Sequence, residues 1–344
     1  MLRNYDELQF GFRPLSSTTS ALIYLHDFIT KHLDDPQLDG VEPIAYDFCK
    51  AFDKLNHDIL LRRLCDLNNP PDLIYWLRNY LKDRFQRVRI SAHHSELSSI
   101  CSGVPQGSLL GPYLFCAFVS NLRAIHASNA IVKYADDSAL ISSIPSIDSD
   151  RQQLREEHES ILNWSTTNKL PINIGKCCII GFPKRPNFVP TILSNIKKTN
   201  VLKYLGTTLT SDLKLKTHVG LIVKRASRAL HILRILKPFT PKTDLINVYN
   251  MLMRSILEYA NPLFIGLPST QHNRLLRVQK RAHKIICGSD CVLDCLGNLL
   301  QRRRNQSLSL FKKCLQSDHL LNCIIPPRAQ SLRIQIPYSC SNRR

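Results

Sequence analysis

Apolar and polar positions follow different patterns in two parts of the chain, which meet near residues 211–216. In the first part, segments of helical periodicity are separated by short apolar runs that turn residues bound. Helices are expected at residues 17–32, 55–67, 72–82, 108–125 and 149–167. Strands are expected at residues 42–47, 85–92, 95–101, 131–135, 138–142, 172–182 and 201–209. This mixture predicts an α+β region.

The second part is helical and basic. Amphipathic spacing predicts helices at residues 218–237, 242–259 and 270–287, separated by prolines. Between Lys214 and Arg304 there are 17 Lys and Arg against 4 Asp and Glu, and the whole chain carries a formal charge of +19. Such an excess favours a polyanionic partner, because basic side chains release counterions when they bind phosphates. A basic helical face more often lies in solvent, but beside an α/β catalytic region a nucleic-acid clamp is the better interpretation, and we expect Arg302, Arg303 and Arg304 to contribute to it.

Two segments, the start of the chain and an uncharged stretch, indicate where in the cell the protein is expected. Arg3, Asp6 and Glu7 leave no apolar run ahead of a cleavage site, so we expect a protein that is not secreted and lies in the cytoplasm or nucleus. Residues 97–122 carry no charge, but glycines and prolines interrupt them and the apolar part is too short to cross a bilayer. No membrane partner is expected.

Twelve cysteines in such a protein are expected to be reduced and mostly packed in the core. Cys287, Cys291 and Cys295 recur every four residues. There is no CxxC pair, so three thiols on one face of a helix or turn are favoured over a zinc site.

Acidic residues end two of the expected strands. Asp47 follows the apolar run at residues 43–46, and Asp136 and Asp137 join two apolar runs as the tip of a hairpin. Placed side by side, these strands would gather three carboxylates at one edge, a set of ligands that suits Mg²⁺ together with substrate phosphates. Two such ions hold an attacking hydroxyl and a leaving group in line. Taken singly, each Asp is explained equally well as a turn residue.

Further motifs follow in a fixed order along the chain. The opening Gln9-Phe10-Gly11-Phe12-Arg13 precedes Asp47 and the sequence Lys50-Ala51-Phe52-Asp53. After them come Ser102-Gly103-Val104-Pro105-Gln106-Gly107-Ser108, Tyr134-Ala135-Asp136-Asp137, Lys176, Tyr204-Leu205-Gly206 and Leu257-Glu258-Tyr259. In this order the set resembles reverse transcriptases of the jockey-like, non-LTR (LINE-type) retrotransposons, and the resemblance covers nearly the whole chain.

The resemblance implies a right-hand polymerase, with an antiparallel palm sheet and packed helices. It places a partial fingers region at residues 1–40, the palm at 41–212, a helical thumb at 213–290 and a C-terminal helical extension with a tail at 291–344. It also implies an RNA template, a DNA primer and dNTPs as partners. The sequence does not specify an oligomeric state.

The resemblance further implies roles for single residues. Asp47, Asp136 and Asp137 match the acidic cluster that binds two Mg²⁺ ions, for which Mn²⁺ is a possible substitute. Phe52 matches the aromatic gate against a ribose 2′-OH, although a core aromatic is the alternative. Gln106 and Gly107 match the loop around the nucleotide. Lys176 matches a lysine that protonates the departing pyrophosphate, whereas alone it would be a solvated strand end.

The chain also departs from the family pattern. Family members carry a fingers segment ahead of the first motif and commonly an endonuclease domain, whereas eight residues precede Gln9 here. We therefore expect an N-terminally truncated member. Tyr46-Asp47-Phe48-Cys49 stands where Leu-Asp-Leu-Ser is usual, and residues 170–176 depart from the usual Leu-Asn-x-x-Lys spacing.

Three functions are compatible with these features. The first is an RNA-directed DNA polymerase, and the second is a catalytically inactive, nucleic-acid-binding remnant of a retrotransposon that lacks the N-terminal fingers. A generic metal-dependent phosphohydrolase explains the acids but neither the position of Phe52 nor the basic helices. Primer extension separates the first two.

Overall fold

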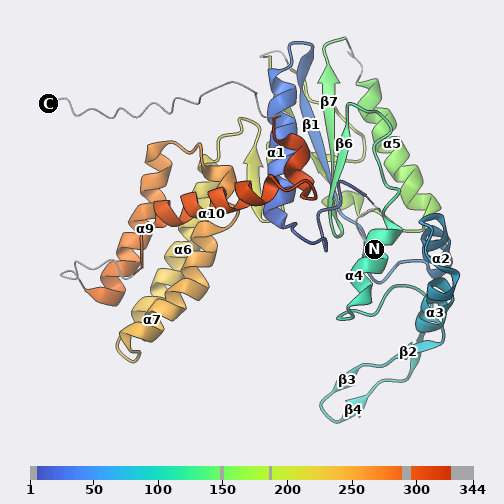
Figure 1. Ribbon diagram of the computed structural model, residues 1–344, viewed down its shortest axis with the longest axis horizontal. Helices are drawn as coiled ribbons and strands as arrows, with labels where there is room; N and C mark the ends of the chain where they lie inside the picture. Colours follow the sequence, from blue (N-terminus) through green and yellow to red (C-terminus); the bar gives the residue numbers. More distant parts are fainter. Residues whose placement is uncertain (1–5, 148–150, 186–187, 289–295, 327–344) are drawn as a thin grey trace.

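The computed structural model describes residues 6–147, 151–185, 188–288 and 296–326, and a six-stranded sheet lies at its centre. The strand order is β10-β8-β1-β7-β6, and β9 also pairs with β1. The long strands β1 (Leu38–Tyr46) and β7 (Asp137–Pro145) are antiparallel, and β6 (Ala130–Tyr134) forms a hairpin with β7 (Figure 1). The expected strands at residues 42–47, 131–135 and 138–142 are confirmed.

Helices cover both faces of the sheet. Successive side chains of a strand point to opposite faces, so each strand contributes to two cores. Ile131 and Leu140 pack in one core with α2 (His57–Asp66), α3 (Pro71–Leu81), α4 (Leu110–Phe118) and α5 (Gln152–Thr167). Val132 and Ile141 pack in a second core with α1 (Thr18–Asp34) and the helices of the C-terminal region. Figure 1 shows α1 and α5 on opposite sides of the sheet.

The C-terminal region is helical, as expected. It consists of α6 (Lys216–Leu236), α7 (Lys242–Tyr249), η3 (Asn250–Arg254), α8 (Ser255–Glu258), η4 (Asn261–Phe264), α9 (Ser269–Cys287), α10 (Leu299–Cys314) and η5 (Leu320–Ile324). The expected helix at residues 242–259 is present, with a π-helical turn at η3 in its middle. Helix α1 contacts both η4 and η5, so this region shares a core with the start of the chain.

Two expected strands are shorter than their apolar runs. Residues 172–182 do not form one strand, because a 3-10 turn, η2 (Ile174–Lys176), precedes β8 (Cys178–Ile179) and β9 (Phe182–Pro183). Residues 201–209 form the hairpin of β11 (Val201–Tyr204) and β12 (Thr207–Thr210), which turns at Leu205 and Gly206 with positive φ. The short strand β10 (Lys197–Lys198) runs parallel to β8.

Helix α4 ends at Phe118, before the expected end at residue 125. The carbonyl groups of Val119 and Leu122 turn instead toward the ammonium of Lys133, which donates to both at 3.1 and 2.5 Å. A charged partner for free carbonyls offsets the loss of further helical hydrogen bonds.

The strands expected at residues 85–92 and 95–101 are found as a projecting hairpin of four short strands, with its turn at residues 91–92. Strand β2 (Arg84–Gln86) pairs with β5 (Ser98–Ile100), and β3 (Arg89–Ile90) pairs with β4 (His93–His94) at the tip. Figure 1 shows this hairpin extending away from α3. Within the described part of the chain, no helix is both long and apolar enough to cross a membrane. Cys287 is the last residue of α9, whereas Cys291 and Cys295 lie outside the described residues.

Candidate active site

Strand register brings the three predicted acids to one end of the sheet. Tyr46 of β1 lies opposite Ser138 of β7, so Asp47, one residue beyond, is level with Asp137. The pair Tyr134 and Asp137 closes the β6–β7 hairpin and leaves Ala135 and Asp136 as its two-residue turn. The carboxylates are accessible, since Asp136 and Asp137 are exposed and the Asp47 side chain is 38% exposed.

The negative charges of Asp47 and Asp136 act on Asp137. The pKa of Asp137 is raised, first because partial burial disfavours its charged form and then because Asp136 and Asp47 are negative. Lys176 of η2 offsets part of this negative charge, because its Nζ lies 3.2 Å from Oδ2 of Asp47. The turn carrying Lys176 is held beside Asp47, because the backbone N–H of Asn173 donates to the Asp47 carbonyl at 2.7 Å.

The donor chemistry of this cluster fits a hard divalent cation. Among the residues that the structure describes, no three His, Cys, Asp or Glu side chains form a group that would hold an ion by themselves. Mg²⁺ does not need such a cage, because it is commonly bound by one or two carboxylates together with substrate phosphates and water. After burial, the negative charges of Asp136 and Asp47 contribute to the raised pKa of Asp137, and a bound cation would offset that repulsion.

Phe52 lies between two other aromatic rings near this end of the sheet. Its ring stacks on Phe115 of α4 at 4.6 Å and meets Phe12 edge-on at 6.3 Å. The side chain is half-buried, so it packs against the core and is also partly accessible. The structure is therefore compatible with both roles that the sequence left open for Phe52.

The loop with Gln106 and Gly107 is fastened to the turn after Phe52. Val104 donates its backbone N–H to the Phe52 carbonyl at 2.9 Å, and Gln106 Nε2 donates to Asp53 Oδ1 at 2.9 Å. A Cβ at Gly103 would lie 2.6 Å from the Asp53 carbonyl oxygen, which explains why glycine stands there. Gly107 has φ +77 and no heavy atom within 4 Å of a built Cβ, so it needs glycine for its backbone conformation alone.

A polar cavity of about 620 Å³ lies at the root of the projecting hairpin and against this loop. Lys50, His57, Arg84 and Gln106 supply polar groups to its wall. The cavity adjoins the turn that follows Asp47, so an extended anionic ligand at the acids would have basic neighbours here.

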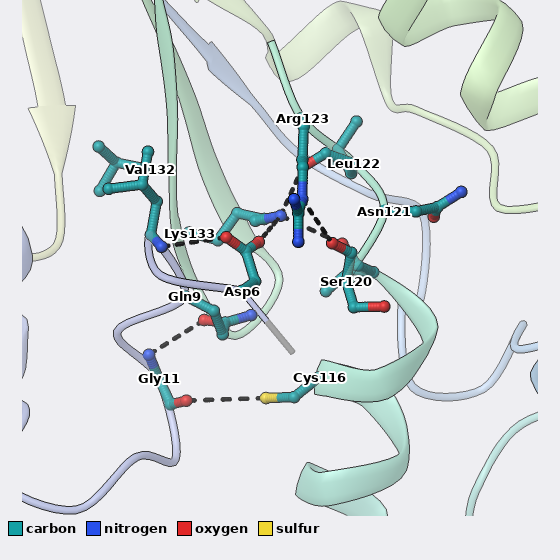
Figure 2. A network of polar contacts seen from close by, with 12 residues as sticks. Asp6, Gln9, Gly11, Cys116, Ser120, Asn121, Leu122, Arg123, Val132 and Lys133 are labelled. Atoms are coloured by element: carbon teal, nitrogen blue, oxygen red, sulfur yellow. Dashed lines mark hydrogen bonds and ion pairs between the residues drawn. The ribbon is translucent and has the colours of Figure 1, made fainter. Parts of the chain in front are cut away.

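Sequence reasoning missed a buried charge beneath the acids. Lys133, in the middle of β6, is fully buried and forms an ion pair with Asp6, whose side chain is 7% exposed (Figure 2). Burial lowers the pKa of Lys133, and Asp6 opposes that shift. The available signal was a lysine between valine and tyrosine in an otherwise apolar strand.

Two other sequence motifs and the start of α1 meet under the hairpin. The Tyr204 hydroxyl donates to the carbonyls of Val132 at 3.2 Å and Asp137 at 3.4 Å. The Tyr259 hydroxyl lies 2.6 Å from the Leu205 carbonyl and 3.1 Å from Oγ1 of Thr18. These tyrosines connect the β11–β12 turn, the start of α1 and the end of α8 with the strands that carry the acids.

The basic helices carry exposed Lys and Arg side chains. Two of the three arginines that were expected to bind nucleic acid are not among them. Arg302 is paired with Glu258 at 2.7 Å, and Arg303 is 4% exposed with its guanidinium over the Phe264 ring. The expectation that Arg302 and Arg303 face a nucleic acid is therefore wrong, because both are used inside the fold, whereas Arg304 is exposed. Helices α6 and α9 pack together and carry the exposed residues Lys224, Arg225, Arg228, Arg234, Arg277, Lys280, Arg281 and Lys284, and the exposed Lys237 directly follows α6.

The chain was compared with known proteins. The profile of the family described as "Reverse transcriptase (RNA-dependent DNA polymerase)" matches residues 1–209. The RNA-directed DNA polymerase from mobile element jockey of Drosophila melanogaster is 27% identical over 299 residues, covering 82% of this chain and 32% of the relative. The probable RNA-directed DNA polymerase from transposon BS of the same species is 28% identical over 314 residues, covering 86% and 34%. The chain thus spans about a third of the length of these relatives.

Among solved structures, telomerase from Candida tropicalis, truncated from its C-terminal domain, aligns with a TM-score of 0.45 and 16% identity over 62% of this chain and 42% of that one. Telomerase from Candida albicans, in complex with a fragment of telomeric RNA, aligns with a TM-score of 0.44 and 12% identity over 89% and 52%.

Proposed function

The chain belongs to the reverse transcriptase family, and on that premise we propose that it carries the RNA-directed DNA polymerase activity of a non-LTR retrotransposon. Its substrates would be an RNA template, a DNA primer and dNTPs. The observation that carries the proposal is the strand register that sets Asp47 level with Asp137, the residue that follows Asp136.

The proposed division of labour follows the right-hand arrangement of such polymerases. Residues 1–40 would contribute part of the fingers, 41–212 the palm, 213–290 the thumb and 291–344 a C-terminal extension. The exposed cations on α6 and α9 support a thumb that holds the template–primer by its phosphates, without regard to sequence.

In this proposal Asp47 and Asp136 hold two Mg²⁺ ions, and Asp137 completes the negative cluster. The ions would supply charge neutralisation and alignment of the primer 3′-hydroxyl with the α-phosphate of the nucleotide. Lys176, whose ammonium lies 3.2 Å from Asp47, would protonate the departing pyrophosphate.

Nucleotide selection would fall to the half-buried ring and the loop beside it. Phe52 would exclude a ribose 2′-OH with its accessible part, since Phe115 and Phe12 limit the ways in which the ring can turn away. Gln106 and Gly107 would shape the pocket around the base and sugar, with Gln106 exchanging its bond to Asp53 for a substrate contact.

The test is primer extension on poly(rA)/oligo(dT) with purified protein. We expect Mg²⁺-dependent incorporation of dTTP, which Asp136→Ala abolishes while template–primer binding is retained. Asp66→Ala is the matched control, because Asp66 is a 66% exposed acid at the end of α2. Binding without extension at any protein concentration would favour the alternative, a non-catalytic nucleic-acid-binding remnant.

A salt titration tests the basic face. Binding should weaken steeply with the logarithm of salt concentration, because phosphate contacts release counterions. Replacing Arg277, Lys280 and Arg281 of α9 by Gln should flatten that slope by about 2 to 3. Replacing Arg302 should leave the slope unchanged, since its guanidinium is already paired with Glu258.

A further inference from the structure

The first described residues of the chain run along the strand that carries the catalytic turn. We call residues 6–11 the N-terminal clamp. Its backbone continues the sheet beside β6, because Lys133 N donates to the Leu8 carbonyl at 2.9 Å and Phe10 N donates to the Lys133 carbonyl at 2.7 Å. The ion pair of Asp6 with Lys133 anchors the first residue of the clamp (Figure 2).

One side chain of the clamp reaches the turn itself. Gln9 is 3% exposed, and its Oε1 accepts the backbone N–H of Gly11 at 3.0 Å and that of Ala135 at 3.3 Å. A single amide oxygen therefore joins the clamp to the residue that immediately precedes Asp136.

The turn that receives this bond is strained. Ala135 has φ 56, in the left-handed region that costs a non-glycine residue roughly 1 to 2 kcal/mol. In a two-residue hairpin turn a positive φ is usually taken by glycine, whereas here an alanine takes it. Such a conformation persists only where its surroundings hold it.

The backbone of Gly11 also packs directly against the turn. A Cβ at Gly11 would lie 2.4 Å from the Ala135 nitrogen and 3.1 Å from the Tyr134 carbonyl carbon. The clamp backbone is thus pressed against the peptide bond that leads into the turn, and no larger residue fits between them. The Gly11 carbonyl is itself held by the Cys116 thiol of α4 at 3.6 Å (Figure 2).

We propose that Gln9 is a positioning residue of the polymerase, which holds Ala135 in its strained conformation and so aims the carboxylate of Asp136. The proposal rests on the proposed function, because it assigns a role within that same site. Gln9 would touch neither substrate nor metal, and would act only through the backbone of the turn.

The experiment compares Gln9→Met, which keeps the length of the side chain and removes its amide, with the wild-type chain. We expect kcat for dTTP incorporation to fall roughly 10- to 100-fold, since small misplacements of reacting groups cost about that much. The Mg²⁺ concentration for half-maximal activity should rise several-fold, and the Kd for template–primer should not change.

The matched control is Asn129→Leu. Asn129 is another buried amide, whose Oδ1 accepts the backbone N–H of Ser143 in β7 at 3.1 Å, away from the turn. It should lose stability as Gln9→Met does and keep the wild-type Mg²⁺ dependence. If both variants lose kcat equally with an unchanged Mg²⁺ requirement, Gln9 is merely structural and the proposal is wrong.

The loss should also depend on the residue at the turn. Glycine takes a positive φ without strain, so Gln9→Met should cost at least about threefold less in an Ala135→Gly background. An equal loss in both backgrounds would contradict the mechanism. Should Gln9→Met fail to fold, Gly11→Ala displaces the same turn and must show the same Mg²⁺ shift. No Mg²⁺-dependent extension by the wild-type chain would overturn the proposed function instead.

Discussion

Replacing Lys133 by methionine tests how the β6–β7 hairpin is anchored. Lys133 is fully buried, pairs with the 7% exposed Asp6 and donates to the carbonyls of Val119 and Leu122. Methionine fills a similar volume but leaves Asp6 as a buried charge without its cation. Removing one partner of a buried ion pair costs about 3–5 kcal/mol, so we expect Lys133→Met to lower the free energy of unfolding by that amount.

The double variant separates the charge from the packing. Asp6→Asn with Lys133→Met removes both charges, so the uncompensated carboxylate is no longer buried. We expect this variant to recover about half or more of the loss, because pairs of buried charges are often replaceable by neutral groups at little cost. The remaining loss would come from the two carbonyls that Lys133 no longer satisfies.

Urea denaturation followed by circular dichroism measures these differences. The control is Lys31→Met on α1, whose ion pair with Asp27 is at 2.8 Å but leaves the lysine 55% exposed, and which should change stability by less than about 1 kcal/mol. The reasoning is refuted if Lys133→Met resembles this control, or if the double variant is no more stable than the single one.

Three further predictions concern His218, Asp136 and Tyr259. Burial lowers the pKa of His218 to about 4, so its neutral form stabilises the fold above pH 6.5. Up to roughly 3 kcal/mol of this stability is lost as the pH falls through 4. The free energy of unfolding of His218→Asn, measured at pH 4 and 7, should lack this part of the pH dependence. Asp136→Asn removes a negative charge that, after burial, contributes to the raised pKa of Asp137. At pH 7 without metal this variant should have a free energy of unfolding higher by roughly 0.5 kcal/mol and should show no primer extension. A lower free energy of unfolding would contradict the repulsion between the two acids. Tyr259→Phe removes the hydroxyl between Leu205 and Thr18 and should cost about 1 kcal/mol in urea denaturation, more than Thr18→Val, and equal costs would contradict the Leu205 contact.

Several features of the fold were predictable from local patterns. The helices α1, α2, α3 and α5, the β6–β7 hairpin and the change to a basic helical region all follow from periodicity and turn residues. The motif order predicted the family, which the profile match over residues 1–209 confirms. The pairing of the strands that carry the acids was only a condition of the expected metal site, and the antiparallel register of β1 and β7 is what establishes it.

Local patterns failed where a distant partner determined the outcome. Helix α4 ends early because Lys133 takes up the carbonyls that follow it, and residues 172–182 break because η2 is hydrogen-bonded to the turn at Asp47. Arg302 and Arg303 were expected in solvent, yet a glutamate in α8 and an aromatic ring in η4 draw them inward.

By itself, the sequence determined which side chains are available for metal, nucleotide and phosphate, and in what order they follow along the chain. Only the tertiary structure decided that Asp6, Gln9 and Gly11 lie beneath the turn at Asp136, and that Lys133 is buried there. The physical reason is that propensity and periodicity act over a few residues. A buried charge or a strained turn, in contrast, is stable only through partners that folding brings from far along the chain.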